Sequence, residues 1–233
     1  MVPLERVLNY YFGVVIVVGG LSLLLSIKYV LRTWRTLQRS NWIPLGLAFG
    51  LMALILASLL EAPVLLLRVW VLLALVAGVV EESVKLLPLA FQRASPVWEK
   101  WKLVIGTGLF LGLLEGIMYG AAIIVLGQEP YLLGIRAILI GFHTVWAAIT
   151  AGYLLGTTGA RRFVGLVFSM TAHALYDLPP LAILQGFSSQ EVILLAALST
   201  AFMLATPLMA RESSRKIGES PRGEEPETVI SSP

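Results

Sequence analysis

Apolar runs of about twenty residues recur along the whole chain, and each is long enough to cross a hydrocarbon core of about 30 Å as a helix. The mean hydropathy is +0.85 and 13% of the residues are charged, whereas soluble domains carry about 25%. The sequence therefore predicts an all-α, polytopic helical membrane protein with about seven transmembrane helices. The seven runs lie at about residues 10–30, 43–61, 67–91, 103–127, 132–156, 163–183 and 190–209.

The basic residues alternate between the segments that separate these runs. Thirteen Lys and Arg residues follow the odd-numbered runs, and three lie in the alternate segments. Because basic residues concentrate on the cytoplasmic side of membrane proteins, the N-terminus is predicted outside and the C-terminus in the cytoplasm. The pI near 9.3 then reflects topology, so the lipid bilayer is the expected partner and nucleic acid is not.

The loops between the runs are short, so residues 1–210 are predicted to form a single transmembrane domain. Residues 211–233 are rich in Glu, Ser, Pro, Gly and Arg, which predicts a disordered cytoplasmic tail. The chain has no cysteine, which excludes disulfides and thiolate metal sites.

Ionisable residues interrupt four of the runs at similar depth. Glu81, Glu82 and Lys85 lie in the third run and Glu115 in the fourth. His143 lies in the fifth run, and His173 with Asp177 in the sixth. A charge at the bilayer centre costs roughly 2.5–3.5 kcal/mol on the insertion scale, so such residues indicate a functional site by default.

The spacing of these residues predicts their partners. Glu81 and Lys85 are spaced i, i+4, which favours an ion pair on one helix face. His173 and Asp177 have the same spacing, so Asp177 is expected to hold one imidazole nitrogen and set the tautomer. Gly112, Gly116 and Gly120 share one face of the fourth run and favour close helix packing beside Glu115.

Several catalytic classes are excluded by composition. Asp177 is the only aspartate, so a protease that uses two aspartates is excluded. The chain has two histidines and no His-Glu-x-x-His motif, which excludes the usual zinc-peptidase helix and any three-histidine metal site. If the protein splits water, carboxylate and imidazole groups must do it.

The segment Glu81-Glu82-Ser83-Val84-Lys85 resembles the Glu-Glu-x-x-Lys signature of PrsW-type intramembrane proteases, which belong with the CAAX prenyl endopeptidases and bacteriocin-processing proteins. Residues 112–119, 143–152 and 173–177 resemble the later motifs in family order. The family usually has Asn after the second-motif glutamate, and this chain has Gly116. The resemblance covers about residues 78–180, within a predicted four-helix catalytic core at about 67–183.

The resemblance implies a glutamic-type intramembrane endopeptidase in a prokaryotic-type cell membrane, acting on membrane-anchored protein substrates. Glu81, sharing a proton with Glu82, is then the general base acting on water. His173, oriented by Asp177, binds the water or stabilises the oxyanion; His143 assists, Glu115 contributes to the site, and Lys85 holds the glutamates. No metal is required, although Glu and His ligands allow a divalent ion.

Two other functions remain open on the sequence. Carboxylates and histidines at the midplane also form proton relays, so a proton-coupled transporter is an alternative. A non-catalytic membrane scaffold of the same fold is the other. The sequence does not indicate the substrate or the oligomeric state.

Overall fold

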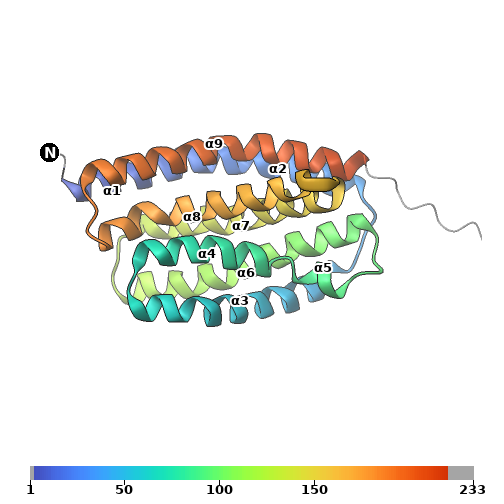
Figure 1. The fold of residues 1–233 in the computed structure, drawn as a ribbon, viewed down its shortest axis with the longest axis horizontal. Helices are drawn as coiled ribbons and strands as arrows, with labels where there is room; N and C mark the ends of the chain where they lie inside the picture. Colours follow the sequence, from blue (N-terminus) through green and yellow to red (C-terminus); the bar gives the residue numbers. More distant parts are fainter. Residues whose placement is uncertain (1–2, 220–233) are drawn as a thin grey trace, which may run out of the picture.

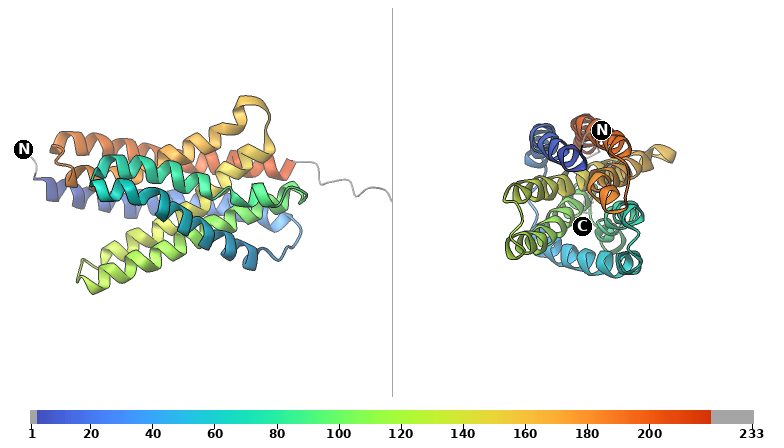
Figure 2. Two further views of the ribbon diagram at one scale, coloured as in Figure 1. Left: turned by 60° about the horizontal axis from the view of Figure 1, so that its bottom comes forward. Right: turned by 90° about the vertical axis from the view of Figure 1, so that its left-hand side faces the viewer.

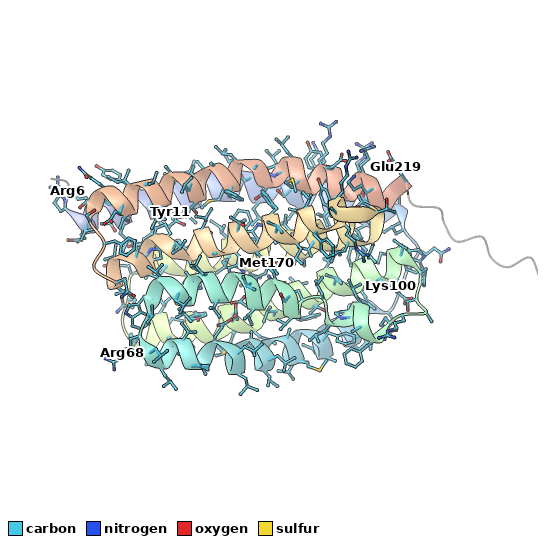
Figure 3. All side chains as sticks on the ribbon, viewed as in Figure 1. Arg6, Tyr11, Arg68, Lys100, Met170 and Glu219 are labelled. Carbon is cyan, nitrogen blue, oxygen red and sulfur yellow. The ribbon has the colours of Figure 1, made fainter. Side chains whose placement is uncertain are left out.

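The structure is a computed structural model that describes residues 3–219, and within that range it contains helices and no strand. The long helices run side by side along one axis, with short connections at both ends of the bundle (Figure 1). Figure 3 shows Arg6 and Arg68 at one end, and Lys100 and Glu219 at the other. These are called below the Arg68 end and the Lys100 end.

The helices follow the order of the predicted runs. The first run is one continuous helical stretch that contains a short π-helical segment, η1. A single 3-10 turn, η2, precedes α8. The bounds are α1 (Leu4–Val14), η1 (Val15–Gly19), α2 (Gly20–Thr36), α3 (Trp42–Leu67), α4 (Trp70–Val84), α5 (Leu87–Phe91), α6 (Val97–Val125), α7 (Tyr131–Gly156), η2 (Gly159–Phe163), α8 (Val164–Leu184) and α9 (Ser189–Glu219).

The all-α polytopic architecture is confirmed. Five helical stretches within the described residues are long and apolar enough to cross a membrane: the stretch Leu4–Thr36, and α3, α6, α7 and α9. Helix α4 falls short because it has 15 residues. Helix α8 is less apolar because it contains His173, Asp177 and two prolines. Helices α4 and α8, which are too short or too polar to meet these limits of length and hydropathy, thus carry most of the predicted site residues.

The third run does not form one helix. Helix α4 ends at Val84, and α5 begins at Leu87 with Pro88 in its first turn. Proline has no N–H to donate and restricts the residue before it, so it is favoured in the first turn of a helix, where Pro88 lies. The last two members of the first motif therefore lie at a helix end.

Helix α9 is longer than the seventh run predicts. It continues to Glu219, so residues 211–219, which the sequence assigns to the disordered tail, are helical. Arg215 pairs with Glu212 and Glu219 on this last part of the helix. Such i, i+3 and i, i+4 pairs stabilise its exposed face, while Ile217 is buried in an apolar cluster of the bundle. The remainder of the predicted tail lies outside the described residues.

The four helices of the predicted core pack in two pairs. Helix α6 packs along α7, and α4 packs along α8, while α7 also contacts α8 and joins the pairs. Helix α3 covers α6, and α2 with α9 covers the other side of the bundle, as the end-on view in Figure 2 shows. At the Arg68 end, the paired ends of α6 and α7 lean away from the other helices (Figure 2).

Large apolar side chains cover the outside of the bundle. Leu66, Val125 and Leu208 are among the most exposed side chains. Such a surface is unfavourable in water and favourable in lipid. A helix is stable there because its backbone polar groups pair within the helix itself. The molecule is an integral membrane protein.

Candidate active site

Helix α4 delivers two glutamates to the middle of the bundle in its last turn. Glu81, Glu82 and Lys85 are all buried, and Glu82 is 0% exposed. Helix α4 reaches this position because Gly78 lies against α8: a Cβ at Gly78 would meet the carbonyl oxygen of Met170 at 2.6 Å. The missing side chain therefore sets the distance between the two helices that bring Glu82 and His173 together.

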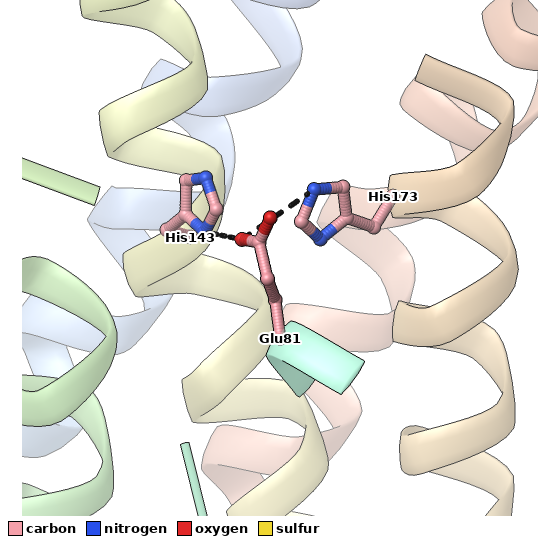
Figure 4. A group of neighbouring side chains, drawn as sticks. All are labelled: Glu81, His143 and His173. Carbon is pink, nitrogen blue, oxygen red and sulfur yellow. Dashed lines mark ion pairs between the residues drawn. The ribbon is translucent and has the colours of Figure 1, made fainter. Parts of the chain in front are cut away.

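Glu81 lies between the two histidines of the chain (Figure 4). Its Oε2 atom is 3.6 Å from Nδ1 of His143 and 3.7 Å from Nε2 of His173. The two imidazole rings are perpendicular, with centroids 5.0 Å apart. Residues far apart in sequence, on α4, α7 and α8, thus point at one spot.

The other nitrogen of each histidine faces a different carboxylate. Nδ1 of His173 is 3.1 Å from Oε1 of Glu82, and Nε2 of His143 is 3.4 Å from Oε2 of Glu115. An ionised carboxylate only accepts hydrogen bonds, so wherever Glu82 and Glu115 are ionised the hydrogens lie on these outer nitrogens. In the neutral form, each ring then directs its lone pair toward Glu81.

One predicted ion pair is wrong, and the predicted contact between Asp177 and His173 is present. Lys85 pairs with Glu82 at 2.5 Å, and not with Glu81. Residues spaced i, i+3 also share a helix face, so Lys85 can reach Glu82 from its position at the C-cap of α4. Asp177 does approach His173, but its Oδ2 lies 3.5 Å from Nε2, the nitrogen that also faces Glu81. Glu82 on the neighbouring helix holds the opposite nitrogen, Nδ1, at a shorter distance of 3.1 Å.

Close packing fixes the two rings. The indole of Trp146 stacks on His173 with centroids 5.3 Å apart, and Trp146 is itself buried. A Cβ at Gly112 would lie 2.9 Å from the Cβ of His143, so the small residue leaves room for the ring. At Gly116, where the family usually has Asn, an added Cβ would collide with Ile140 of α7. The glycine face of α6 thus allows the close approach that its spacing predicts.

Two charged residues near the site were not among the predicted site residues. Glu61 stands at the edge of the predicted second run, but α3 continues to Leu67, so Glu61 lies within the helix. Its Oε1 is buried without a hydrogen-bond partner among residues 3–219, and it interacts electrostatically with Glu115 and His173. Arg136 of α7 lines a small space with Glu115 and His143. Both residues could have been found from the sequence, because each places a charged group within an apolar helix.

The inner atoms of the site form a set that fits a divalent metal. Glu81, His143 and His173 each offer one ligand atom, and these atoms lie within 4.8 Å of one another. Oε2 of Glu81 and Nδ1 of His143 are buried and have no hydrogen-bond partner in the described part of the chain. Two imidazoles and one carboxylate are a usual donor set for Zn²⁺ and related ions. These residues therefore fit such an ion.

A comparison with protein families identifies the chain. The sequence model of the PrsW family of intramembrane metalloproteases matches residues 34–209. The chain belongs to this family. The matched range of this PrsW-family protein contains all seven predicted site residues as well as Glu61, Arg136 and Trp146. Family membership supports a membrane protease function. The comparisons with curated proteins and with solved structures gave no match.

Proposed function

We propose that this protein is an intramembrane endopeptidase that cleaves membrane-anchored proteins at the centre formed by Glu81, His143 and His173. One observation carries the proposal: each histidine turns one nitrogen to Glu81 and the other to a separate carboxylate. In metal-dependent hydrolases, an outer carboxylate of this kind orients a ligating histidine and raises its basicity.

In the proposed mechanism, Glu81, His143 and His173 hold a divalent metal ion. Such an ion lowers the pKa of a bound water and polarises the scissile carbonyl. Glu82 keeps the Nδ1 hydrogen of His173 in place and is itself held by Lys85. Glu115 does the same for Nε2 of His143. Asp177 faces Nε2 of His173 from the more open side of the site and orients polar groups that enter there.

A metal-free version of the mechanism uses the same residues in other roles. Oε2 of Glu81, between the two imidazole nitrogens, accepts the proton of the attacking water as a general base. His173 then stabilises the oxyanion in its doubly protonated form, in which Nε2 also carries a hydrogen, and His143 assists. In this version Glu82 holds Lys85 and His173 through Oε1, and its Oε2 has no partner among residues 3–219. The two versions differ in whether Glu81 binds a metal or a proton.

The activity is tested by comparing new protein N-termini in host membranes that contain the wild type or the Glu81→Gln/Glu82→Gln double variant at matched expression. The matched control is Glu129→Gln, an exposed glutamate in the connection between α6 and α7. We expect a set of termini that disappears in the double variant and persists in the control. Identical profiles from folded proteins would contradict the proposal and favour a transporter or a scaffold.

The metal is tested on the purified protein, with a cleaved substrate from that comparison. We expect about one equivalent of a divalent metal in the wild type and much less in His143→Ala. We also expect a chelator to abolish cleavage and added Zn²⁺ to restore it. Full activity in a metal-free preparation would contradict the metal-dependent mechanism and support Glu81 as the general base.

The predicted orientation, with the N-terminus outside, belongs to this proposal. It places the Arg68 end outside, so the site opens on the side where α6 and α7 lean away from the bundle. Protease protection of tags placed at the two termini tests it. A protected N-terminal tag in right-side-out vesicles would contradict this orientation.

A further inference from the structure

A cavity of about 190 Å³ lies beside the candidate active site, toward the Arg68 end. It is bounded by α1, α6, α7 and α8, and its walls are mainly apolar, with Phe12, Ile123, Leu132 and Ile135 among them. The ends of α6 and α7 that contribute to it are those that lean away from the bundle in Figure 2. Ile123 and Leu132 are half-buried, so this wall is reached from the lipid side.

Two charged side chains form the polar end of this cavity. Asp177 lines it and has its Oδ2 3.5 Å from Nε2 of His173, so the cavity adjoins the site directly. Arg136 lines it as well, and also lines the small space that contains Glu115 and His143. The cavity therefore adjoins the site at its polar end, where the carboxylate of Asp177 and the guanidinium of Arg136 line the cavity.

The guanidinium of Arg136 is held but not neutralised. It lies over the ring of Tyr119, 4.0 Å from the ring centroid. No carboxylate of the described chain lies within 4.0 Å of it. A guanidinium carries five N–H donors and no acceptor, so Arg136 has donors free for another molecule.

A peptide bond in a transmembrane segment can be attacked only after the segment is locally unwound. Unwinding frees backbone carbonyl groups, each of which is costly to leave unpaired in the bilayer. A site that cleaves such a segment therefore needs donors beside the scissile bond and space for the flanking side chains. The cavity supplies both.

We propose that this cavity binds a bulky apolar side chain of the substrate next to the scissile bond, and that Arg136 donates hydrogen bonds to the unwound backbone carbonyls. The inference rests on the proposed function and adds the substrate class: membrane segments with a Leu, Ile, Met or Phe at a fixed position from the cut. Arg136 is a substrate-binding residue and Ile123 a specificity-determining one.

The side-chain part is tested by narrowing the cavity at Ile123. Membranes containing Ile123→Trp are compared with membranes containing Ile124→Trp, in which the neighbouring, 69% exposed side chain points away from the cavity walls. One or a few methylene groups in an apolar pocket change preference by about tenfold or more. We expect cuts next to large apolar residues to fall about tenfold relative to cuts next to Ala or Gly in Ile123→Trp alone.

A second variant keeps the test decisive when tryptophan disturbs folding. Ile123→Ala enlarges the cavity, and we expect it to shift the preference toward Phe and Trp at the same position. Unchanged preferences in both Ile123 variants, with the wild-type termini still produced, would overturn the proposal.

The backbone part is tested with Arg136→Gln, with Arg162→Gln as the control. Arg162 also lies over an aromatic ring, that of Phe163, but on η2 outside the cavity. We expect about tenfold less cleavage at all sites in Arg136→Gln, with unchanged side-chain preference. A loss confined to sites with a nearby Asp or Glu would overturn this role, because it would show that Arg136 binds a substrate carboxylate.

Failure of this inference can be told apart from failure of the proposed function. If the Glu81→Gln/Glu82→Gln variant leaves all termini unchanged, the protease assignment fails. If those termini vanish in that variant but the Ile123 and Arg136 variants behave as wild type, only the cavity assignment fails.

Discussion

Two buried polar regions of this bundle are built in opposite ways. Where α9 packs on α1, α2 and α7, buried hydroxyls find partners: Ser26 donates to the carbonyl of Ser22, Tyr11 to that of Tyr176, and Ser213 to that of Ala148. In the site, buried oxygens of Glu81 and Glu82 and Nδ1 of His143 have no hydrogen-bond partner within residues 3–219. Both regions are polar and buried. In the first, most buried hydroxyls are satisfied by the protein itself, and Ser214 Oγ is an exception. In the site, the unpaired atoms of Glu81 and His143 lie together and face one another.

The difference shows which buried polar groups point to function. A hydroxyl can donate to a helix carbonyl one turn earlier or on the next helix, so it can be buried at low cost. Carboxylate oxygens and imidazole lone pairs that face one another need a proton or a cation between them. The unsatisfied group therefore indicates a bound ligand, while the satisfied group indicates packing.

The largest expected effect comes from removing an inner ligand of the site. Glu81→Gln should lower cleavage about 1000-fold or more, because residues that act as a unit lose nearly all activity when one is removed. The melting temperature should not fall, since the variant removes an unpaired buried charge. Cleavage of a substrate found by terminal mapping and thermal unfolding in detergent measure the two quantities. If Glu81→Gln retained activity, the unpaired groups of the site would not be needed for cleavage. The contrast between the two polar regions would then say nothing about function.

The next effect comes from the outer carboxylates. Glu115→Gln should lower metal affinity or activity about 10–100-fold, the usual cost of losing a partner that orients a ligating histidine. Titration of the metal-free protein with Zn²⁺, followed by calorimetry, measures the affinity. An unchanged affinity with unchanged activity would mean that Glu115 does not orient His143.

Glu82 has two roles, because it contacts His173 in the site and also forms an ion pair with Lys85. Glu82→Gln should lose about 3–5 kcal/mol of stability, since Lys85 is left as an unpaired buried charge. The double variant Glu82→Gln/Lys85→Met should regain most of that stability without regaining activity. Denaturant unfolding and a cleavage assay separate the two effects. Recovery of activity in the double variant would show that Glu82 serves only the ion pair.

A smaller effect is expected where helix packing sets the geometry. Gly78→Ala should cost about 1–3 kcal/mol through overpacking and lower activity, because the new methyl meets the backbone of α8. Gly134→Ala, whose added Cβ meets nothing within 4 Å, is the control. If both variants unfold at the same denaturant concentration, the close approach of α4 and α8 is not required.

The smallest effect is expected in the satisfied region. Ser213→Ala removes one hydrogen bond to the carbonyl of Ala148 and should cost about 1 kcal/mol. Activity should stay within about twofold of wild type, because the hydroxyl serves packing alone. The same cleavage assay and unfolding measurement apply. A strong loss of activity with unchanged stability would place this region in the catalytic machinery.

Much of the site could be predicted from single residues. Glu81, Glu82, Glu115, His143 and His173 converge as expected, because a charged or imidazole group in an apolar helix turns away from lipid and toward the bundle. Glu61 was missed because the predicted run ended at it, whereas α3 continues for more than a turn. Helix ends in apolar sequence depend on the next loop and its packing, which a hydropathy pattern does not contain.

The sequence by itself determined the all-helical membrane fold, because apolar runs of this length have few alternatives in a bilayer, and it determined which helices carry the polar groups. Only the tertiary structure decided the pairings. Lys85 pairs with Glu82, three residues before it, while Glu81 faces the two histidines. Glu82 faces Nδ1 of His173 because Gly78 lets α4 approach α8. Spacing within one helix gives the face of a residue, but the partner across a contact depends on helix ends, crossing and depth, which packing sets.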